Sequence, residues 1–176
     1  IFSGSCCGTS GIVAELVSDK GHKLVRDADI VSEASRLSGI SSHKIDRSFS
    51  AKTSVFNKFT HERERSIAYV KLALAQALFK ENLVIEGFIA HLIPREITHV
   101  LRVCLIADIP FRIQTAIQER QLSESDAMKQ IRKDDEDAAA WVRDLMEAND
   151  PWEASLYDML LPTDKLRQSE IVERIV

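Results

Sequence analysis

The chain has 176 residues, of which 45% are hydrophobic and 28% are charged. This composition is typical of globular proteins, and the length suits one domain with an apolar core. The formal net charge of -4 excludes the global basic field that recruits nucleic acid or an anionic membrane. We therefore expect neither nucleic acid nor a membrane among its partners. The longest apolar runs, such as Val100 to Ala107, are far too short to span a bilayer.

The three cysteines indicate a reducing compartment. Cys6 and Cys7 are adjacent and Cys104 lies in an apolar run, so there is neither CxxC spacing nor an even set for disulfides. The first residues also lack the features of a secretion signal. We expect a cytoplasmic protein. Because Ile1 already lies in an expected strand, the natural polypeptide is expected to begin further upstream, which leaves room for an upstream regulatory domain.

The opening residues IFSGSCCGTSG predict a strand, a glycine-rich turn and the start of a helix. Aligned with the phosphate-loop pattern G-x-x-x-x-G-K-[ST], Ser3 stands at the first glycine and Thr9 at the lysine. Backbone N–H groups and the positive end of a helix dipole attract an anion without that lysine. We therefore expect Ser3 to Ser10 to bind phosphate. The alternative is a turn of small residues that only packs the strand against the helix.

Four further short runs are rich in β-forming residues. Between them the apolar residues recur at helical spacing, on one face of a long helix that starts near Thr60 and on the helices before and after residue 120. The expected strands are His22 to Val25, Asn82 to Glu86, Val100 to Ile106 and Tyr157 to Leu161. The expected face of the long helix is formed by Leu72, Ala75, Leu78 and Phe79. The expected faces on either side of residue 120 are formed by Ile113 and Ile117 and by Ala127 and Ile131. Short strands that alternate with helices predict a three-layer α/β/α fold with a parallel sheet covered on both faces.

Ligands of open α/β sheets bind beyond the carboxyl ends of the strands. Asp27 follows the second expected strand and is either a site residue or part of a solvated turn. Glu86 follows the third and either orients a magnesium ion through water or is a surface or helix-terminal carboxylate. After the fourth, Asp108 and Arg112 border a helix, and Asp108 is better explained as its N-cap.

Two charged runs are candidates for phosphate contacts. The run from Ile131 to Asp137 suits a lid that closes cations over phosphates, or it is a solvated helix face. Arg63 and Arg65 could reach a substrate phosphate, since arginine binds phosphate bidentately, or they remain on a helix surface. The five histidines lack metal-ligand spacing, so the side chains alone predict no metal site.

Taken in order, four segments resemble the cytidylate-kinase-like branch of the nucleoside monophosphate kinases, which are phosphate-loop NTPases. They are the opening loop, Glu86-Gly87-Phe88, the cluster from Arg132 to Asp137, and the closing stretch from Leu156 to Asp164. The resemblance spans nearly the whole chain. It implies one domain over residues 1–176 with a five-stranded parallel sheet between helices. The core would be residues 1–37 and 66–176, with the irregular segment from Ser38 inside a substrate-binding insertion at 38–65, and a lid at 120–150.

The resemblance also implies an activity, which is transfer of the ATP γ-phosphoryl group to a nucleoside monophosphate or another small acceptor, with Mg²⁺. Arg132 and Asp135 would act as catalytic residues from the lid. By position, the residues that would bind the ATP phosphates are Gly4, Ser5, Cys6, Cys7, Gly8, Thr9 and Ser10, with the Ser10 hydroxyl on Mg²⁺. Those that would border the acceptor are Asp27, Arg63, Glu86, Gly87 and Phe88.

Several positions depart from the family pattern. Thr9 replaces the loop lysine, Ile89 and Ala90 follow Phe88 where an arginine is common, and Ala138 stands at the place of a second lid arginine. A cation on a transferring phosphoryl group contributes roughly 10³- to 10⁵-fold in rate, so these losses are expected to weaken catalysis more than binding. The candidate replacements are Lys20, Arg95, Lys133 and Arg143. The alternative function is a catalytically inactive nucleotide-sensing or interaction module of a larger regulatory protein, and a third is a structural domain that binds no nucleotide.

Overall fold

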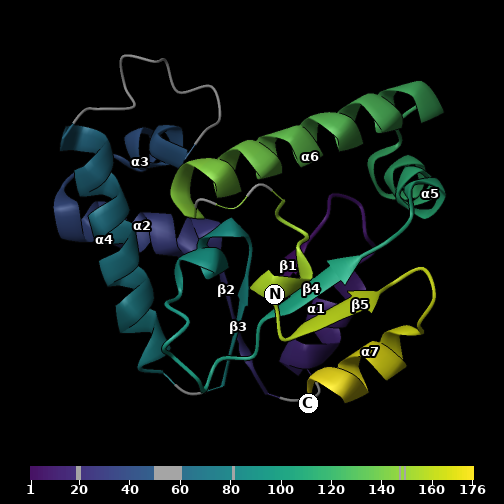
Figure 1. Cartoon of the computed structure of the whole chain (residues 1–176), viewed down its shortest axis with the longest axis horizontal. Coiled ribbons are helices and arrows are strands. Elements are labelled where there is room, and N and C mark those ends of the chain that lie inside the picture. The colour runs from purple at the N-terminus through teal and green to yellow at the C-terminus, as the bar shows by residue number, and fades with distance from the viewer. Residues whose placement is uncertain (19–20, 50–60, 81, 147, 149) are drawn as a thin grey trace. The chain divides into compact units, whose positions relative to one another are not determined.

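The computed structural model describes residues 1–18, 21–49, 61–80, 82–146, 148 and 150–176. These residues form two compact units (Figure 1). The first unit comprises Ile1–His22 and Thr98–Val176, and the second comprises Lys23–Ile97. Lys20, Thr60 and parts of the expected insertion and lid, residues 50–60, 147 and 149, lie outside the described residues.

The first unit contains a parallel sheet with the strand order β1-β4-β5. Phe2 of β1 pairs with Cys104 of β4, and Val103 of β4 pairs with Met159 of β5. Its elements are β1 (Phe2–Ser3), α1 (Ser10–Ser18), β4 (Val103–Ile106), α5 (Ile109–Arg120), α6 (Glu124–Met146), the 3-10 helix η3 (Ala154–Leu156), β5 (Met159–Pro162) and α7 (Gln168–Ile175). The β1-to-α1 connection therefore starts from a strand that is paired with β4.

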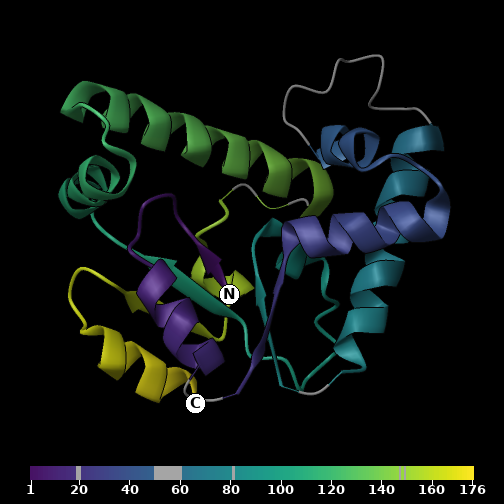
Figure 2. The ribbon, with the colours of Figure 1, turned by 180° about the vertical axis from the view of Figure 1, so that it is seen from behind.

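Apolar side chains hold the helices of the first unit in place. Helices α1 and α7 pack side by side (Figure 2), and Leu16 and Ile171 from these helices are almost fully buried. A second cluster joins α5 to α6, and it includes Cys6 of the opening loop. Its members are Cys6, Ile113, Ala116, Ala127 and Ile131, with Ile117 packed against them. The helix face predicted for this region is confirmed.

The second unit contains a two-stranded parallel sheet of β2 and β3, in which Arg26 pairs with Glu86. Its elements are β2 (Lys23–Arg26), α2 (Asp27–Ser38), α3 (Ser42–Phe49), α4 (His61–Leu78), β3 (Leu83–Glu86) and the 3-10 helix η2 (Phe88–Leu92). Helix α3 occupies part of the segment that was expected to be irregular. Its Ile45 is fully buried, and most of its other residues with described side chains are exposed, so such a short helix gave too weak a periodic signal to predict it.

The sequence correctly located five strands in a mixed α/β fold, each within a few residues, but the single five-stranded sheet is wrong. The described strands form one three-stranded and one two-stranded parallel sheet. Strand β1 has only two residues, Phe2 and Ser3, and both pair with β4. Apolar runs show where strands lie, whereas their pairing depends on contacts that the runs do not encode.

The apolar face predicted for α4 is also wrong. Leu72 and Phe79 are 45% and 89% exposed, and Ala75 is exposed as well. The buried residues of α4 are Ser66, Val70, Ala73 and Leu74. The helix carries two apolar stripes at helical spacing. The stripe that contains Val70, Ala73 and Leu74 is the buried one, because α4 packs against α2 and α3. Within the described ranges, no helix has the length and apolar character needed to cross a membrane.

Candidate functional site

The loop between β1 and α1 is a tight turn with two residues in the left-handed backbone region. Gly8 has φ 64° and Cys6 has φ 60°. Glycine adopts this conformation at little cost, whereas for cysteine it is strained. The Cys6 side chain is held in the α5–α6 apolar cluster, and this packing offsets the strain. The loop conformation is therefore built into the core of the first unit.

Two carbonyl groups of the loop are anchored by side chains from later elements. The Nε of Arg112 donates to the Ser5 oxygen at 2.7 Å, and the Oγ1 of Thr163 donates to the Cys7 oxygen at 2.7 Å. Because a trans peptide plane points its C=O and the next N–H in opposite directions, the N–H groups of Cys6 and Gly8 point away from these anchors. Among the described residues, the N–H groups of Ser5, Cys6, Gly8 and Thr9 donate to no backbone carbonyl, while the turn at Ser5 and Cys6 brings the Cys7 N–H toward the Gly4 carbonyl.

Arg112 is a buried cation directly beside the loop. Its side chain is 7% exposed, and its two terminal nitrogens donate to the carboxylate oxygens of Asp135 at 2.6 and 2.9 Å. A Cβ added to Gly4 would lie 3.5 Å from the guanidinium and 3.1 Å from the Cys7 sulfur, so the loop is closely packed here. The charge of Arg112 is thus neutralised by a bidentate ion pair.

A second carboxylate of α6 contacts the loop itself. The Ser5 hydroxyl donates to Oδ2 of Asp134 at 2.6 Å. The Nε2 of Gln130, one helical turn earlier, donates to Oδ1 of the same carboxylate at 2.6 Å. A guanidinium nitrogen of Arg120 lies 3.8 Å from Oδ2. Two hydrogen-bond donors and a nearby guanidinium therefore surround a carboxylate at the glycine-rich loop.

The thiols of Cys7 in the loop and Cys104 in β4 are not suited to nucleophilic chemistry. Burial raises the pKa of Cys7 to about 11, although the nearby Arg112 charge opposes this shift. Burial likewise raises the pKa of Cys104 to about 12. Since the thiolate is the reactive form, both side chains are neutral near pH 7 and act as small apolar groups.

Four of the five residues predicted to border an acceptor come together in the second unit, at the carboxyl ends of β2 and β3. Asp27 accepts hydrogen bonds from the N–H groups of Phe88 and Ile89 at 2.9 and 3.0 Å. Burial raises the pKa of Asp27 above its usual range, and the two N–H donors oppose that shift. A Cβ on Gly87 would overlap the Asp27 carboxylate. Glu86 pairs instead with Arg26, at 3.1 Å.

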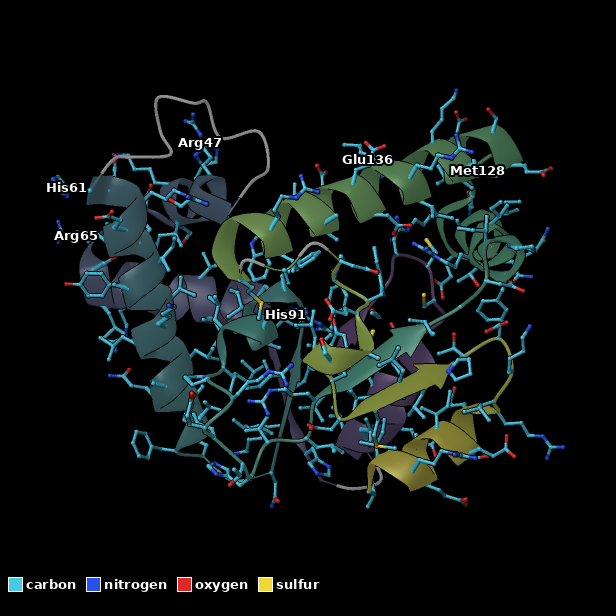
Figure 3. The ribbon with its side chains drawn as sticks, in the orientation of Figure 1. Arg47, His61, Arg65, His91, Met128 and Glu136 are labelled. Atoms are coloured by element: carbon cyan, nitrogen blue, oxygen red, sulfur yellow. The ribbon has the colours of Figure 1, made fainter. Side chains whose placement is uncertain are left out.

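Other predicted residues are more scattered. Arg63 donates to the Ser48 oxygen at 3.2 Å, still within the second unit. Arg132 is exposed on α6, and so is Glu136 on the outer side of that helix (Figure 3). Ser10 is exposed at the first residue of α1. Three of the candidate replacement cations, Arg95, Lys133 and Arg143, are exposed.

The sequence reasoning missed the roles of Arg112, Thr163 and Asp134. A signal existed for Arg112, because it lies on α5 beside Ile113 and one turn before Ala116, which are buried. A charge within a buried stripe indicates an internal ion pair.

The prediction that Asp108 caps α5 is confirmed, since its carboxylate accepts from the Phe111 N–H at 2.9 Å. In the part of the chain that the structure describes, no three His, Cys, Asp or Glu side chains are grouped to hold a metal ion.

Parallel strands joined by helices, with a glycine-rich loop between the first strand and the first helix, define a mixed α/β protein. A sequence model of the cytidylate kinase-like family matches residues 2–165, and the chain belongs to this family. The family places it among kinase-like, nucleotide-binding domains in general.

One solved structure supports the fold. It is the crystal structure of an uncharacterized protein from Eubacterium ventriosum ATCC 27560, with a TM-score of 0.72 and 12% sequence identity. The alignment covers 99% of this chain and 92% of that protein. No curated protein shows significant similarity to the chain.

Proposed function

We propose that the chain is a nucleotide-binding domain that holds nucleotide phosphates on the loop from Gly4 to Ser10 and transfers the ATP γ-phosphoryl group to a nucleoside monophosphate or another small acceptor. One observation carries the proposal. The carbonyls of Ser5 and Cys7 are tied to Arg112 and Thr163, so the N–H groups of Cys6 and Gly8 point the other way, and neither donates to a backbone carbonyl among the described residues. Such N–H groups before a helix suit an anion.

The loop suits a phosphate group better than a metal ion, because its available groups are mostly donors. The Ser10 hydroxyl, at the start of α1, would contact Mg²⁺ held mainly by the phosphates and water. When bound, the ion would supply positive charge that neutralises the phosphate oxygens during transfer. The N–H groups of the loop would orient the phosphates, and the start of α1 would add its dipole.

The acceptor would bind through the second unit. Asp27 fixes the backbone of Phe88 and Ile89, so the Glu86-Gly87-Phe88 segment is held in one conformation. The carboxylate of Glu86, which is partly exposed, could accept a hydrogen bond from a sugar or base. Arg63 would contribute a cation for an acceptor phosphate, and Arg132 on α6 would stabilise charge during transfer.

A second candidate function is a nucleotide-binding module without catalysis. Thr9 stands where the loop lysine is expected, and the guanidinium of Arg112 beside the loop is already neutralised by Asp135. Neither group offers the phosphates an unpaired positive charge. Since such a charge contributes roughly 10³- to 10⁵-fold in rate, binding without transfer is the specific expectation of this alternative.

Calorimetric titration of ATP, with and without Mg²⁺, followed by phosphate-transfer assays with CMP, dCMP, UMP and AMP, separates these functions. Transfer to any acceptor supports the kinase, and binding without transfer supports the module. If millimolar nucleotide does not bind, both are wrong. Thr9→Lys would restore the loop cation and is expected to raise transfer at least tenfold in a weak kinase. Thr98→Lys, which adds the same charge at an exposed residue, is the matched control.

A further inference from the structure

The carboxylate of Asp134 is held at the loop as a bound anion would be. Its Oδ2 accepts from the Ser5 hydroxyl at 2.6 Å and lies 3.8 Å from an Arg120 nitrogen. Its Oδ1 accepts from Gln130 at 2.6 Å. Figures 1 and 2 both show the loop after β1 reaching toward α6, which carries Asp134. A hydroxyl, an amide and a guanidinium are the side-chain donors that proteins use for phosphate oxygens.

A phosphate group and the Asp134 carboxylate cannot share the Ser5 hydroxyl. A hydroxyl donates one hydrogen bond, and two negative charges within about 4 Å repel each other even where the effective dielectric constant is about 20. Resting on the proposed function, we propose that Asp134 is an internal anion that closes the loop, and that a nucleotide phosphate displaces it and takes over Ser5 and Arg120. Arg120 then supplies the cation that Thr9 does not.

The neighbouring Asp135 is not the group that is displaced. It forms two short bonds to the buried Arg112, and breaking them would leave a cation without a partner inside the first unit. Asp134 is held less firmly. Its side chain is 30% exposed, that of Arg120 is 45% exposed, and their separation of 3.8 Å is long for an ion pair.

Release of Asp134 also has a low cost. Gln130 lies four residues earlier on the same helix, so its amide keeps its bond to Asp134 after the carboxylate leaves Ser5. Arg120 is at the last residue of α5, where an exposed guanidinium is free to turn toward a new anion. Where a binding-competent form is populated one-tenth of the time, its ligand binds about tenfold more weakly. We therefore expect the contact between Asp134 and Ser5 to weaken phosphate binding by about tenfold.

The test is calorimetry with Mg·ATP and, separately, inorganic tripolyphosphate. Asp134→Asn keeps the size of the side chain and removes its charge, so it should bind both probes about tenfold more tightly than the wild-type chain. The matched control is Asp137→Asn, which makes the same charge change at an exposed residue of α6 and should stay within about twofold of wild type. Arg120→Gln, added to Asp134→Asn, should remove about tenfold in affinity, whereas Lys129→Gln should not.

The outcomes separate this inference from the proposed function. If the wild-type chain binds ATP and Asp134→Asn binds it equally or more weakly, the internal anion is wrong and the nucleotide-binding function stands. If neither the wild-type chain nor any variant binds, the proposed function is wrong, and the inference with it. Circular dichroism verifies folding, and Gln130→Ala, which removes a bond that Asp134 keeps in both forms, should leave the affinity within about twofold of the wild-type value.

Discussion

The guanidinium of Arg112 and the carboxylate of Asp135 join α5 to α6 directly beside the glycine-rich loop. Two terminal nitrogens reach the two carboxylate oxygens, and the remaining Nε holds the Ser5 carbonyl. Because the Arg112 side chain is only 7% exposed, water cannot replace a missing partner. The pair thus links the stability of the first unit to the conformation of its loop.

Removal of one charge from this pair should be strongly destabilising. We expect Arg112→Met and Asp135→Leu each to lower the free energy of unfolding by about 3 kcal/mol, because an unpaired buried charge remains or a buried acceptor is lost. The double variant should lose less than the sum of the two. Urea denaturation measures all three. The exposed pair of Glu33 and Arg36 is the control, and its removal should change stability little. Additive losses at Arg112 and Asp135 would contradict the coupling.

Gly8 is needed for both the shape and the access of the loop. A valine there would be strained at φ 64°, by about 1 to 2 kcal/mol, and its side chain would block the close approach of a phosphate. We expect Gly8→Val to weaken ATP binding at least tenfold in a calorimetric titration. Gly39→Val has similar backbone strain at φ 71° with open space around it, so it should lose stability and keep its affinity. Unchanged affinity in Gly8→Val would argue against the loop as the phosphate site.

Gly87 leaves room for the Asp27 carboxylate in the second unit. A Cβ at Gly87 would overlap that carboxylate, so Gly87→Ala should destabilise the protein by about 1 to 3 kcal/mol. Asp27→Ala removes the carboxylate that such a Cβ would overlap. It also removes the acceptor of the Phe88 and Ile89 N–H groups, at a similar cost. The double variant should therefore lose less than the sum when unfolding is followed in urea. Strictly additive losses would mean that the two residues do not compete for this space.

His91 should make the protein less stable in acid. Burial lowers the pKa of the His91 imidazole (labelled in Figure 3) to about 4, although its contact with the Phe88 carbonyl opposes this shift. The unfolded chain takes up this proton near pH 6.5, so the free energy of unfolding falls as the pH drops from about 6.5 to 4. The limiting slope for this group is about 1.4 kcal/mol per pH unit.

The His91→Asn variant isolates this contribution, because every other titrating group remains. Urea denaturation at pH 7, 6, 5 and 4.5 should show a shallower loss of stability than in the wild-type chain. Equal slopes for wild type and His91→Asn would show that the imidazole titrates alike in the folded and unfolded states.

Local sequence patterns determined more of the fold than of the site. The approximate places of the strands, the cap at Asp108 and the buried faces of α5 and α6 around Ile113 and Ile131 all follow from short-range spacing, because each depends on residues within one or two turns. The exposed stripe of Leu72 and Phe79 shows the limit of such spacing. Two apolar stripes on one helix look alike until a neighbouring helix covers one of them.

The sequence by itself determined the family, the place of the glycine-rich loop and the threonine at position 9, where a phosphate-loop lysine would stand. Only the tertiary structure decided that Arg112 and Thr163, more than 100 residues away from Ser5 and Cys7, hold their carbonyls. It also decided that Asp135 neutralises Arg112 and that Asp134 contacts Ser5. The physical reason is that these bonds join residues from different elements. Their partners depend on how α5, α6 and β5 pack against β1, which no local pattern around the loop encodes.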